Sequence, residues 1–337
     1  MTKEVISACP GGLCNRLKCL ISCFRMSEEY NRKLKLYWPK NWACGADFKD
    51  LFENKIETLS LEQLERIEKE GDYFFYTDQN NIISLHKEKE IITDTWRFCL
   101  FNKEVQRGFS KEVTPKIGES IDFEYNRIPL KVKEKIIAKI KKLKIKKEIA
   151  KTVDNFAKKN GVSATIGLHI RRGDIVDSKD GWGKISSEEK FIEKIKEILA
   201  KDLSQRFFLA TDSSETENRL LKIFGKNMIV FPKKIVKRNE KESLVESLIE
   251  LLLLSKTKKI IGTYQSTFTE MAWWFGGAKK EIEILATEEE KENLRKFRHG
   301  ERRSLKIRLK KTILRILKKY PRFYKKQYSL REIWVNQ

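Results

Sequence analysis

The sequence predicts an α/β protein with two domains, and three observations support this prediction. The chain has 337 residues, enough for about two domains that each bury their own core. From residue 163 onward, short apolar segments alternate strictly with segments of helical periodicity. Near the N-terminus, a strand-like segment leads through two glycines into another helical pattern. Strict alternation predicts a doubly wound parallel sheet with right-handed crossovers.

Residues 1–155 are expected to form the N-terminal domain. Segment 4–9 predicts a strand, and apolar residues recur at helical spacing between positions 13 and 24. Residues 35–38 predict a second strand, whereas 40–125 mix short apolar and polar stretches without a clear order. The first domain is therefore predicted as a looser α/β unit.

Residues 156–290 are expected to form the C-terminal domain around one parallel sheet. Its predicted strands are 163–170, 206–212, 227–231, 258–263 and 281–285. The helices predicted within it are 187–201, 215–224, 243–255 and 267–275. Two further helices, 132–143 and 145–156 (with Gly161 as C-cap of the second), are predicted at the boundary between the domains. Ligands bind such sheets at the carboxyl ends of the strands, so residues just after a strand are candidates for a site.

Three strand ends of the second half carry polar residues. They are Arg171, Arg172 and Asp174; Thr211, Asp212, Ser213 and Ser214; and Tyr264, Gln265, Ser266 and Thr267. Because a helix begins at the third cluster, its hydroxyls and free amides can hold an anion. An arginine from the neighbouring strand end would complete a phosphate site. Two simpler interpretations stay open: Ser266 or Thr267 as an ordinary helix cap, and Arg171 with Asp174 as a structural salt bridge.

Four motifs give a family resemblance. GGLCNRL at 11–17, HIRRGD at 169–174, FLATDSSE at 208–215 and GTYQSTFTEMAWW at 262–274 occur in this order. They resemble motifs of the α1,2-, α1,6- and protein O-fucosyltransferase superfamily, which includes the nodulation fucosyltransferases. The resemblance implies a GT-B architecture, in which two Rossmann-like domains face each other across a cleft. It also implies that the C-terminal domain binds a GDP-sugar and that the N-terminal domain helps to bind the acceptor.

The resemblance implies roles for individual residues. The first arginine of the motif, Arg171, is expected to contact the β-phosphate and to act in catalysis. The residues expected to bind the donor are Gly12, Asn15, Arg16, His169, Arg172, Asp212, Glu250, Ser266 and Thr267. The chain has no DxD motif, since Asp174 and Asp177 are separated by two residues. We therefore expect a metal-free site in which arginine stabilises the departing diphosphate.

Two further carboxylates are assigned by the resemblance. Guanine presents two parallel N–H donors that one carboxylate accepts together, and the family position for this acid falls on Glu250, with Glu246 as the alternative. An inverting transfer needs a base near the acceptor hydroxyl. The family position falls on Lys179, which cannot serve, so Asp177 is expected and Asp174 is the alternative.

The charge is strongly positive and concentrated at the C-terminus. Lys and Arg number 71 against 48 acids, a net charge of +23, and segment 302–326 contains no acid. On a helix, this part of the predicted amphipathic tail, 291–337, separates an apolar arc from a basic face. That pattern predicts a helix lying on an anionic membrane surface, and the alternative is a helix packed on one domain.

The expected activity is metal-independent, inverting transfer of fucose from GDP-fucose to a glycan or lipid-linked acceptor. The alternatives are a basic nucleic-acid-binding protein, against which the absence of known recognition motifs argues, and a non-catalytic GDP-sugar-binding relative. No nucleic-acid partner and no cofactor beyond the donor are expected. No signal-peptide pattern or apolar span occurs, so a cytoplasmic, partly membrane-surface location is expected. The six cysteines lack zinc-site spacing and are expected to be reduced and mostly buried.

Overall fold

A computed structural model describes residues 4–9, 11–29, 31–70, 74–76, 89–92, 130–173, 175, 181–233 and 238–302. Three parts of the sequence predictions lie outside these residues: the candidate bases Asp174 and Asp177, the thiol of Cys99, and the tail beyond Arg302. The five described cysteines are free and buried, as expected.

The first half contains a parallel five-stranded sheet in the order β3-β2-β1-β5-β4. Its strands are β1 (Glu4–Ser7), β2 (Lys33–Leu36), β3 (Glu57–Thr58), β4 (Phe74–Tyr76) and β5 (Lys89–Ile92). Helix α1 (Leu13–Glu29) follows β1 and packs against β1 and β2. The second strand therefore lies two residues before its predicted position, and the part of 40–125 that the sequence left unordered supplies β3, β4 and β5.

The second half contains another parallel sheet, in the order β10-β9-β6-β7-β8. Its strands are β6 (Ile166–Ile170), β7 (Phe207–Thr211), β8 (Met228–Val230), β9 (Lys259–Gly262) and β10 (Glu281–Ile284). The intervening helices are α8 (Glu188–Lys201), α9 (Ser214–Phe224), α10 (Lys241–Lys256) and α11 (Thr267–Phe275). The predicted alternation is confirmed. Strand β6 is central, because it pairs with β7 on one side and β9 on the other.

The remaining helices connect or extend the halves. They are α2 (Phe48–Leu51), α3 (Leu61–Glu70), α5 (Leu130–Ile140), α6 (Lys147–Asn160), α7 (Trp182–Ile185) and α12 (Glu288–Arg302). Gly161 caps α6 in the left-handed conformation (φ 62°, ψ 37°), as the sequence predicts;. Helix α7 was not predicted from the sequence, and it forms part of the site. Position 155, the proposed domain boundary, lies inside α6, which packs on α10, and the boundary stays a prediction.

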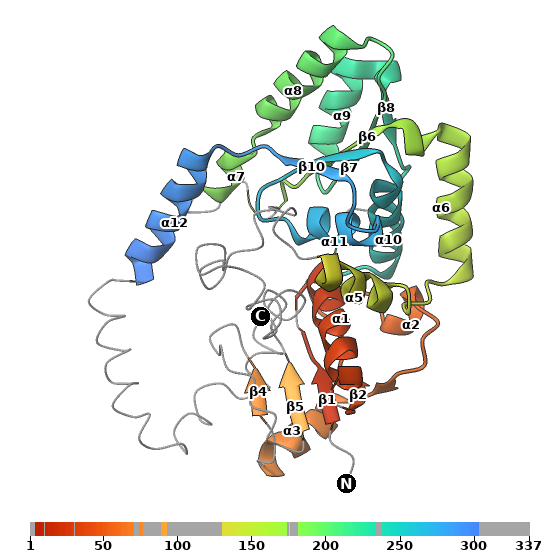
Figure 1. Ribbon diagram of the computed structural model, residues 1–337, viewed down its shortest axis with the longest axis vertical. Coiled ribbons are helices and arrows are strands. Elements are labelled where there is room, and N and C mark those ends of the chain that lie inside the picture. Colours follow the sequence, from red (N-terminus) through yellow and green to blue (C-terminus); the bar gives the residue numbers. More distant parts are fainter. Residues whose placement is uncertain are drawn as a thin grey trace.

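Helices join the two sheets through one continuous core. Helix α11 contacts α1, α5 and α10, and Figure 1 shows these helices between the upper and lower sheets. The largest core cluster includes Leu17 of α1, Leu248 of α10 and Trp273 of α11. A fully buried ion pair, Lys18 Nζ to Glu270 Oε2 at 2.7 Å, also connects α1 to α11. The beginnings of α1 and α11 are therefore held close together.

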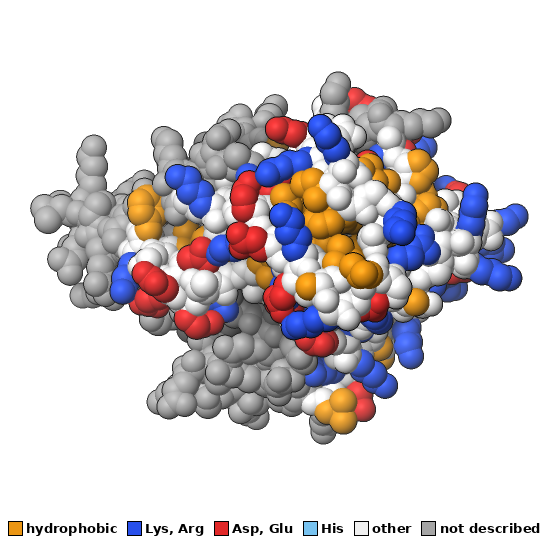
Figure 2. All heavy atoms as spheres, turned by 90° about the horizontal axis from the view of Figure 1, so that it is seen from above, with side chains coloured by type: hydrophobic (Ala, Val, Ile, Leu, Met, Phe, Trp, Pro, Cys, Tyr) orange, Lys and Arg blue, Asp and Glu red, His pale blue; other side chains and the backbone are white. Residues whose placement is uncertain are grey.

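The described surface mixes charges of both signs. In the view of Figure 2, Lys and Arg side chains lie among acidic ones, and hydrophobic side chains gather near the centre of the described surface. This face therefore presents no continuous basic stripe within the described residues. No helix among the described ranges combines the length and apolar character needed to cross a bilayer.

Candidate functional site

A cavity of about 530 Å³ lies where residues of both halves meet. Its walls combine the β1–α1 turn and the turn around Trp42 with the carboxyl ends of β6, β7, β8 and β9. The predicted residues that line it are Gly12, Asn15, His169, Arg171, Asp212, Glu250, Ser266 and Thr267. The strand ends that the sequence marked as candidates thus meet in one place, as expected for a parallel sheet.

Arg171 is the first residue after β6, and its neighbours fix it. Its backbone N–H donates to Thr263 Oγ1 at 3.0 Å, and the Thr263 hydroxyl donates to the carbonyl of His169, also at 3.0 Å. The guanidinium carbon lies 4.9 Å from the centroid of the Trp182 ring, whose indole N–H donates to the Tyr264 carbonyl. Cation–π contact thus positions Arg171 on the wall of the cavity. The ring comes from α7, the helix that the sequence analysis did not foresee.

His169 lies at the end of β6 and is almost fully buried. Its Nδ1 is 2.6 Å from Thr269 Oγ1, and its ring stacks on Phe268 with centroids 4.7 Å apart. Gly262 permits this arrangement, since a Cβ there would lie 2.3 Å from Thr269 Cγ2. Burial lowers the pKa of His169 to about 3. The imidazole is therefore neutral near pH 7 and can donate or accept hydrogen bonds without carrying charge.

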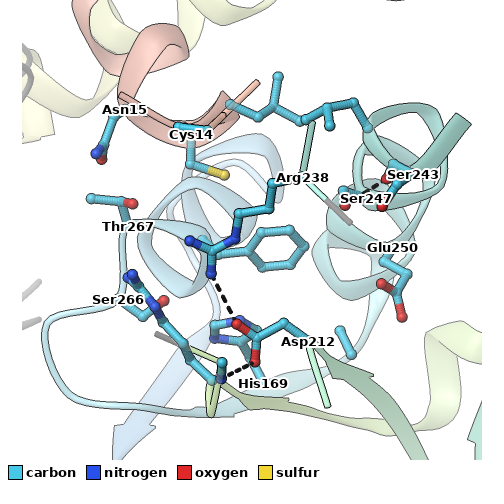
Figure 3. Close-up of a pocket in the computed structure, with 18 of the residues that line it drawn as sticks. Cys14, Asn15, His169, Asp212, Arg238, Ser243, Ser247, Glu250, Ser266 and Thr267 are labelled. Carbon is cyan, nitrogen blue, oxygen red and sulfur yellow. Dashed lines mark hydrogen bonds and ion pairs between the residues drawn. The ribbon is translucent and has the colours of Figure 1, made fainter. Parts of the chain in front are cut away.

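The N-termini of α1 and α11 both face the cavity. Ser266 occupies the N-cap position of α11 but its side chain makes no capping hydrogen bond, and its buried hydroxyl oxygen has no partner. Asn15 Oδ1, in the first turn of α1, is likewise buried without a partner. Figure 3 shows these two residues on the same side of the cavity, with Thr267 between them. The free N–H groups of the two helix N-termini and the Ser266 hydroxyl can donate to an anionic ligand, whereas Asn15 Oδ1 can only accept, for example from a sugar hydroxyl.

Glu250 lies on α10 at the opposite side of the cavity (Figure 3). The carboxylate is 5% exposed and accepts from Lys233 Nζ at 2.9 Å. Lys233 also pairs with Glu217 at 2.9 Å and donates to the Thr211 carbonyl. Burial raises the pKa of Glu250 to about 7, although Lys233 opposes the rise. Glu246, the alternative, is not among the residues that line the cavity.

Three predicted donor-binding residues support the site instead of presenting their side chains freely to it. Arg16 is buried, and its guanidinium donates to Gly11 O, Pro39 O and Asn41 Oδ1. The Arg172 guanidinium donates to the Gly183 carbonyl of α7 at 3.0 Å. Asp212 lines the cavity, but its Oδ1 accepts the N–H groups of Arg172 and Gly173 at 2.7 and 3.1 Å. All three therefore hold the loops that carry the ligand-facing groups.

The cavity also contains residues that the sequence analysis did not select. They are Gly11, Leu13, Cys14, Trp42, Ala43, Gly173, Ala210, Lys233, Arg238, Ser243, Leu244, Ser247 and Phe268. Lys233 and Arg238 follow β8. Only the ends of β6, β7 and β9 had been considered as candidates from the sequence. The carboxyl-end rule applied to residues 231–240 would have marked this segment, whose four cations include Lys233 and Arg238;.

No group of three or more His, Cys, Asp or Glu side chains within the described ranges could hold a metal ion. Asp174 and Asp177, the candidate bases, belong to the segment after Gly173 that is described only at Ile175 and from Gly181 onward. Metal independence and the identity of the base therefore stay predictions.

Comparison with solved structures identifies the fold. The chain matches NodZ α-1,6-fucosyltransferase soaked with GDP-fucose at a TM-score of 0.52, with 17% identity over 82% of this chain and 93% of that one. It matches fucosyltransferase NodZ from Bradyrhizobium at 0.51, with 18% identity over 81% and 91%. A mutant of Arabidopsis thaliana FUT1 in complex with GDP matches at 0.52, with 16% identity over 86% and 72%. No protein-family model and no curated protein sequence matches the chain. The chain therefore has the α/β fold of these fucosyltransferases, as the four sequence motifs indicated.

Proposed function

We propose that this protein is a glycosyltransferase that moves fucose from GDP-fucose to a hydroxyl group of a glycan or glycolipid. One observation carries the proposal: two helix N-termini and Arg171 border a single cavity, where Asn15 Oδ1 and Ser266 Oγ are buried without partners. Unsatisfied buried oxygens cost free energy unless a ligand pairs with them. A crystal structure of NodZ, which has the same fold, was soaked with GDP-fucose, and this supports the choice of donor.

The diphosphate is assigned to the side of the cavity near Arg171 and the start of α11. In the transfer, the bond between the fucose anomeric carbon and the β-phosphate oxygen breaks, and its electron pair stays on the GDP leaving group. A guanidinium and fixed amide dipoles stabilise this developing charge. In this assignment the neutral His169 donates a hydrogen bond and adds no charge.

The guanine is assigned to the side near Glu250. An ionised carboxylate accepts the two parallel N–H groups of guanine, which uracil lacks in this arrangement. Lys233 stabilises the ionised form through its 2.9 Å contact. Recognition of guanine then depends on a carboxylate whose pKa lies near 7.

The acceptor is assigned to the side of the first half, in a two-domain GT-B arrangement. Inversion requires the acceptor oxygen to attack the anomeric carbon opposite the leaving diphosphate, while a base removes its proton. Asp177 is proposed as this base, with Asp174 as the alternative. The basic tail would bring the enzyme to anionic membrane carrying lipid-linked acceptors, on the cytoplasmic face; no nucleic-acid partner is proposed.

Calorimetric titration with GDP, UDP and GDP-fucose tests the proposal. We expect GDP and GDP-fucose to bind, and UDP to bind at least about tenfold more weakly, a difference of about 1.4 kcal/mol. Arg171→Ala should keep the fold but lose nearly all transfer, because a charge-assisted phosphate contact contributes roughly 1.5 to 3 kcal/mol even before the transition state. An Arg171→Ala enzyme with more than about a tenth of wild-type activity would contradict the assignment. GDP binding without turnover across a broad set of acceptors would indicate a non-catalytic sugar-nucleotide-binding protein.

A further inference from the structure

Arg238 brings a second guanidinium to the cavity from a direction different from that of Arg171. It lines the cavity and comes from the segment after β8, whereas Arg171 comes from β6. Figure 3 shows the Arg238 side chain reaching into the middle of the cavity, between Cys14 at the start of α1 and Asp212. Arg171 and Arg238 are the two arginines among the described residues that line this space.

The backbone of Arg238 is fixed by the first half of the chain. Gly45 N–H donates to the Arg238 carbonyl at 2.9 Å. The two backbones approach so closely that a Cβ on Gly45 would lie 2.1 Å from the Asn239 carbonyl oxygen. Gly45 therefore gives the segment starting at Arg238 a defined docking point across the cavity from the second sheet.

The side chain of Arg238 is held by the second half. Its Nη2 donates to Asp212 Oδ2 at 3.0 Å, while Asp212 Oδ1 accepts the backbone N–H groups that follow Arg171. Asp212 thus sets the relative positions of Arg238 and the Arg171 loop. The Arg238 and Asp212 side chains are 38% and 25% exposed, and an ion pair this accessible to water contributes little to folding stability. Stability alone is a weak reason for a guanidinium at the centre of a cavity.

Both arginines act electrostatically on the same interior. The positive charges of Arg171 and Arg238 each lower the pKa of His169, where burial is the largest cause. Both also act to lower the pKa of the Cys14 thiol, although burial raises that pKa overall. The positive charges of Arg171 and Arg238 therefore both act on His169 of β6 and on Cys14 of α1. A ligand between His169 and Cys14 would therefore interact electrostatically with both guanidinium groups.

We propose that Arg238 is a second phosphate-binding residue, which contacts the nucleoside diphosphate from a different strand end than Arg171 and is positioned by Asp212 and Gly45. The proposal rests on the proposed function, because the ligand is the diphosphate of the GDP-sugar. Two guanidinium groups can each present paired N–H donors to phosphate oxygens. Because its backbone is docked on the first half, Arg238 also couples diphosphate binding to the contact between the halves.

The test is calorimetric titration of GDP, GMP and guanosine into the full-length wild type and three variants. In Arg238→Gln, GDP affinity should fall at least about tenfold, or about 1.4 kcal/mol, while guanosine affinity stays unchanged and GMP falls less than GDP. Arg238→Lys should recover part of the loss, because an ammonium retains the charge but not the planar fork. Arg219→Gln is the matched control, since Arg219 is also an ion-paired, half-exposed arginine, on α9, and it should change none of the three affinities.

The outcomes separate this inference from the proposed function. If the wild type binds GDP and Arg238→Gln binds it equally well, Arg238 is not a phosphate ligand although the proposed function stands. If Arg238→Gln loses guanosine and GDP to the same extent, the residue acts on the nucleoside pocket or on folding, and the inference is wrong. If Arg238→Gln does not fold, Arg238→Lys serves as the test instead. A GDP affinity of Arg238→Lys equal to that of the wild type contradicts a role for the planar guanidinium of Arg238. A wild type that binds no GDP overturns the proposed function and this inference with it.

Discussion

Breaking the Lys18–Glu270 ion pair should destabilise the protein by far more than removing a surface ion pair. Both side chains are buried, with 0% and 2% exposure, and the N–O distance is 2.7 Å. Lys18→Met leaves the Glu270 carboxylate buried, with the Trp274 indole N–H at 3.4 Å. An uncompensated buried charge of this kind costs about 3 to 5 kcal/mol. We therefore expect the free energy of unfolding to fall by about that amount in Lys18→Met.

Urea unfolding followed by tryptophan fluorescence measures this change, because Trp273 and Trp274 are buried beside the pair. The double variant Lys18→Met/Glu270→Leu removes both charges and should recover most of the loss, since replacing a buried pair by apolar groups is often neutral. Lys201→Met on α8 is the control: its pair with Glu197 is exposed and should contribute less than about 1 kcal/mol. A loss below about 1 kcal/mol in Lys18→Met, or a double variant as unstable as the single one, would refute the reasoning.

Three other predictions concern the ligand and the tail. Burial raises the pKa of Glu250 to about 7, so GDP affinity should fall about tenfold as the pH drops from 8 to 6 and the carboxylate becomes protonated. In calorimetry, Glu250→Gln should bind GDP weakly and without this pH dependence. An equally steep pH dependence in Glu250→Gln would assign the titration to another group. Chelation with EDTA should leave the transfer rate unchanged, and restoration of lost activity by Mg²⁺ or Mn²⁺ would show that a metal is needed. Truncation after Arg302, where α12 ends, should abolish pelleting with anionic vesicles and preserve transfer to a soluble acceptor; an unfolded or inactive truncated protein would place the apolar arc of the tail in the core.

Periodicity predicted the second half of the fold well, because its central strands are mostly apolar and buried and helical segments separate them. The predicted strand 206–212 corresponds to β7, and the predicted helix 267–275 is α11. The first half was harder, because its strands are short and polar: β2 reads KLKL and β3 reads ET. Strand β2 is placed by pairing with β1, and β3 by pairing with β2, and local sequence does not encode this pairing.

The rule that ligands bind at the carboxyl ends of parallel strands predicted some residues of the candidate site and missed others. Strand ends correctly located Arg171, Asp212, Ser266 and Thr267 at the cavity, and His169 came from the family resemblance. Glu250 also came from the family resemblance, and the structure places it at the cavity through α10, a helix buried on several faces. For most positions, no rule applied to the sequence distinguished residues that face the ligand from residues that hold a loop.

The parity of residues along β6 supplies that distinction for the two adjacent arginines. Successive side chains of a strand point to opposite faces, and His169, Arg171 and Gly173 line the cavity. Ile170, on the other face, packs in the hydrophobic cluster beneath the sheet, and Arg172 turns to the Gly183 carbonyl. Gly173 brings the third position close to Asp212, since a Cβ there would lie 2.8 Å from Asp212 Oδ2. The alternation thus continues past the end of the strand, so that one arginine faces the anion site and its neighbour fixes the helix α7 whose Trp182 supports the first.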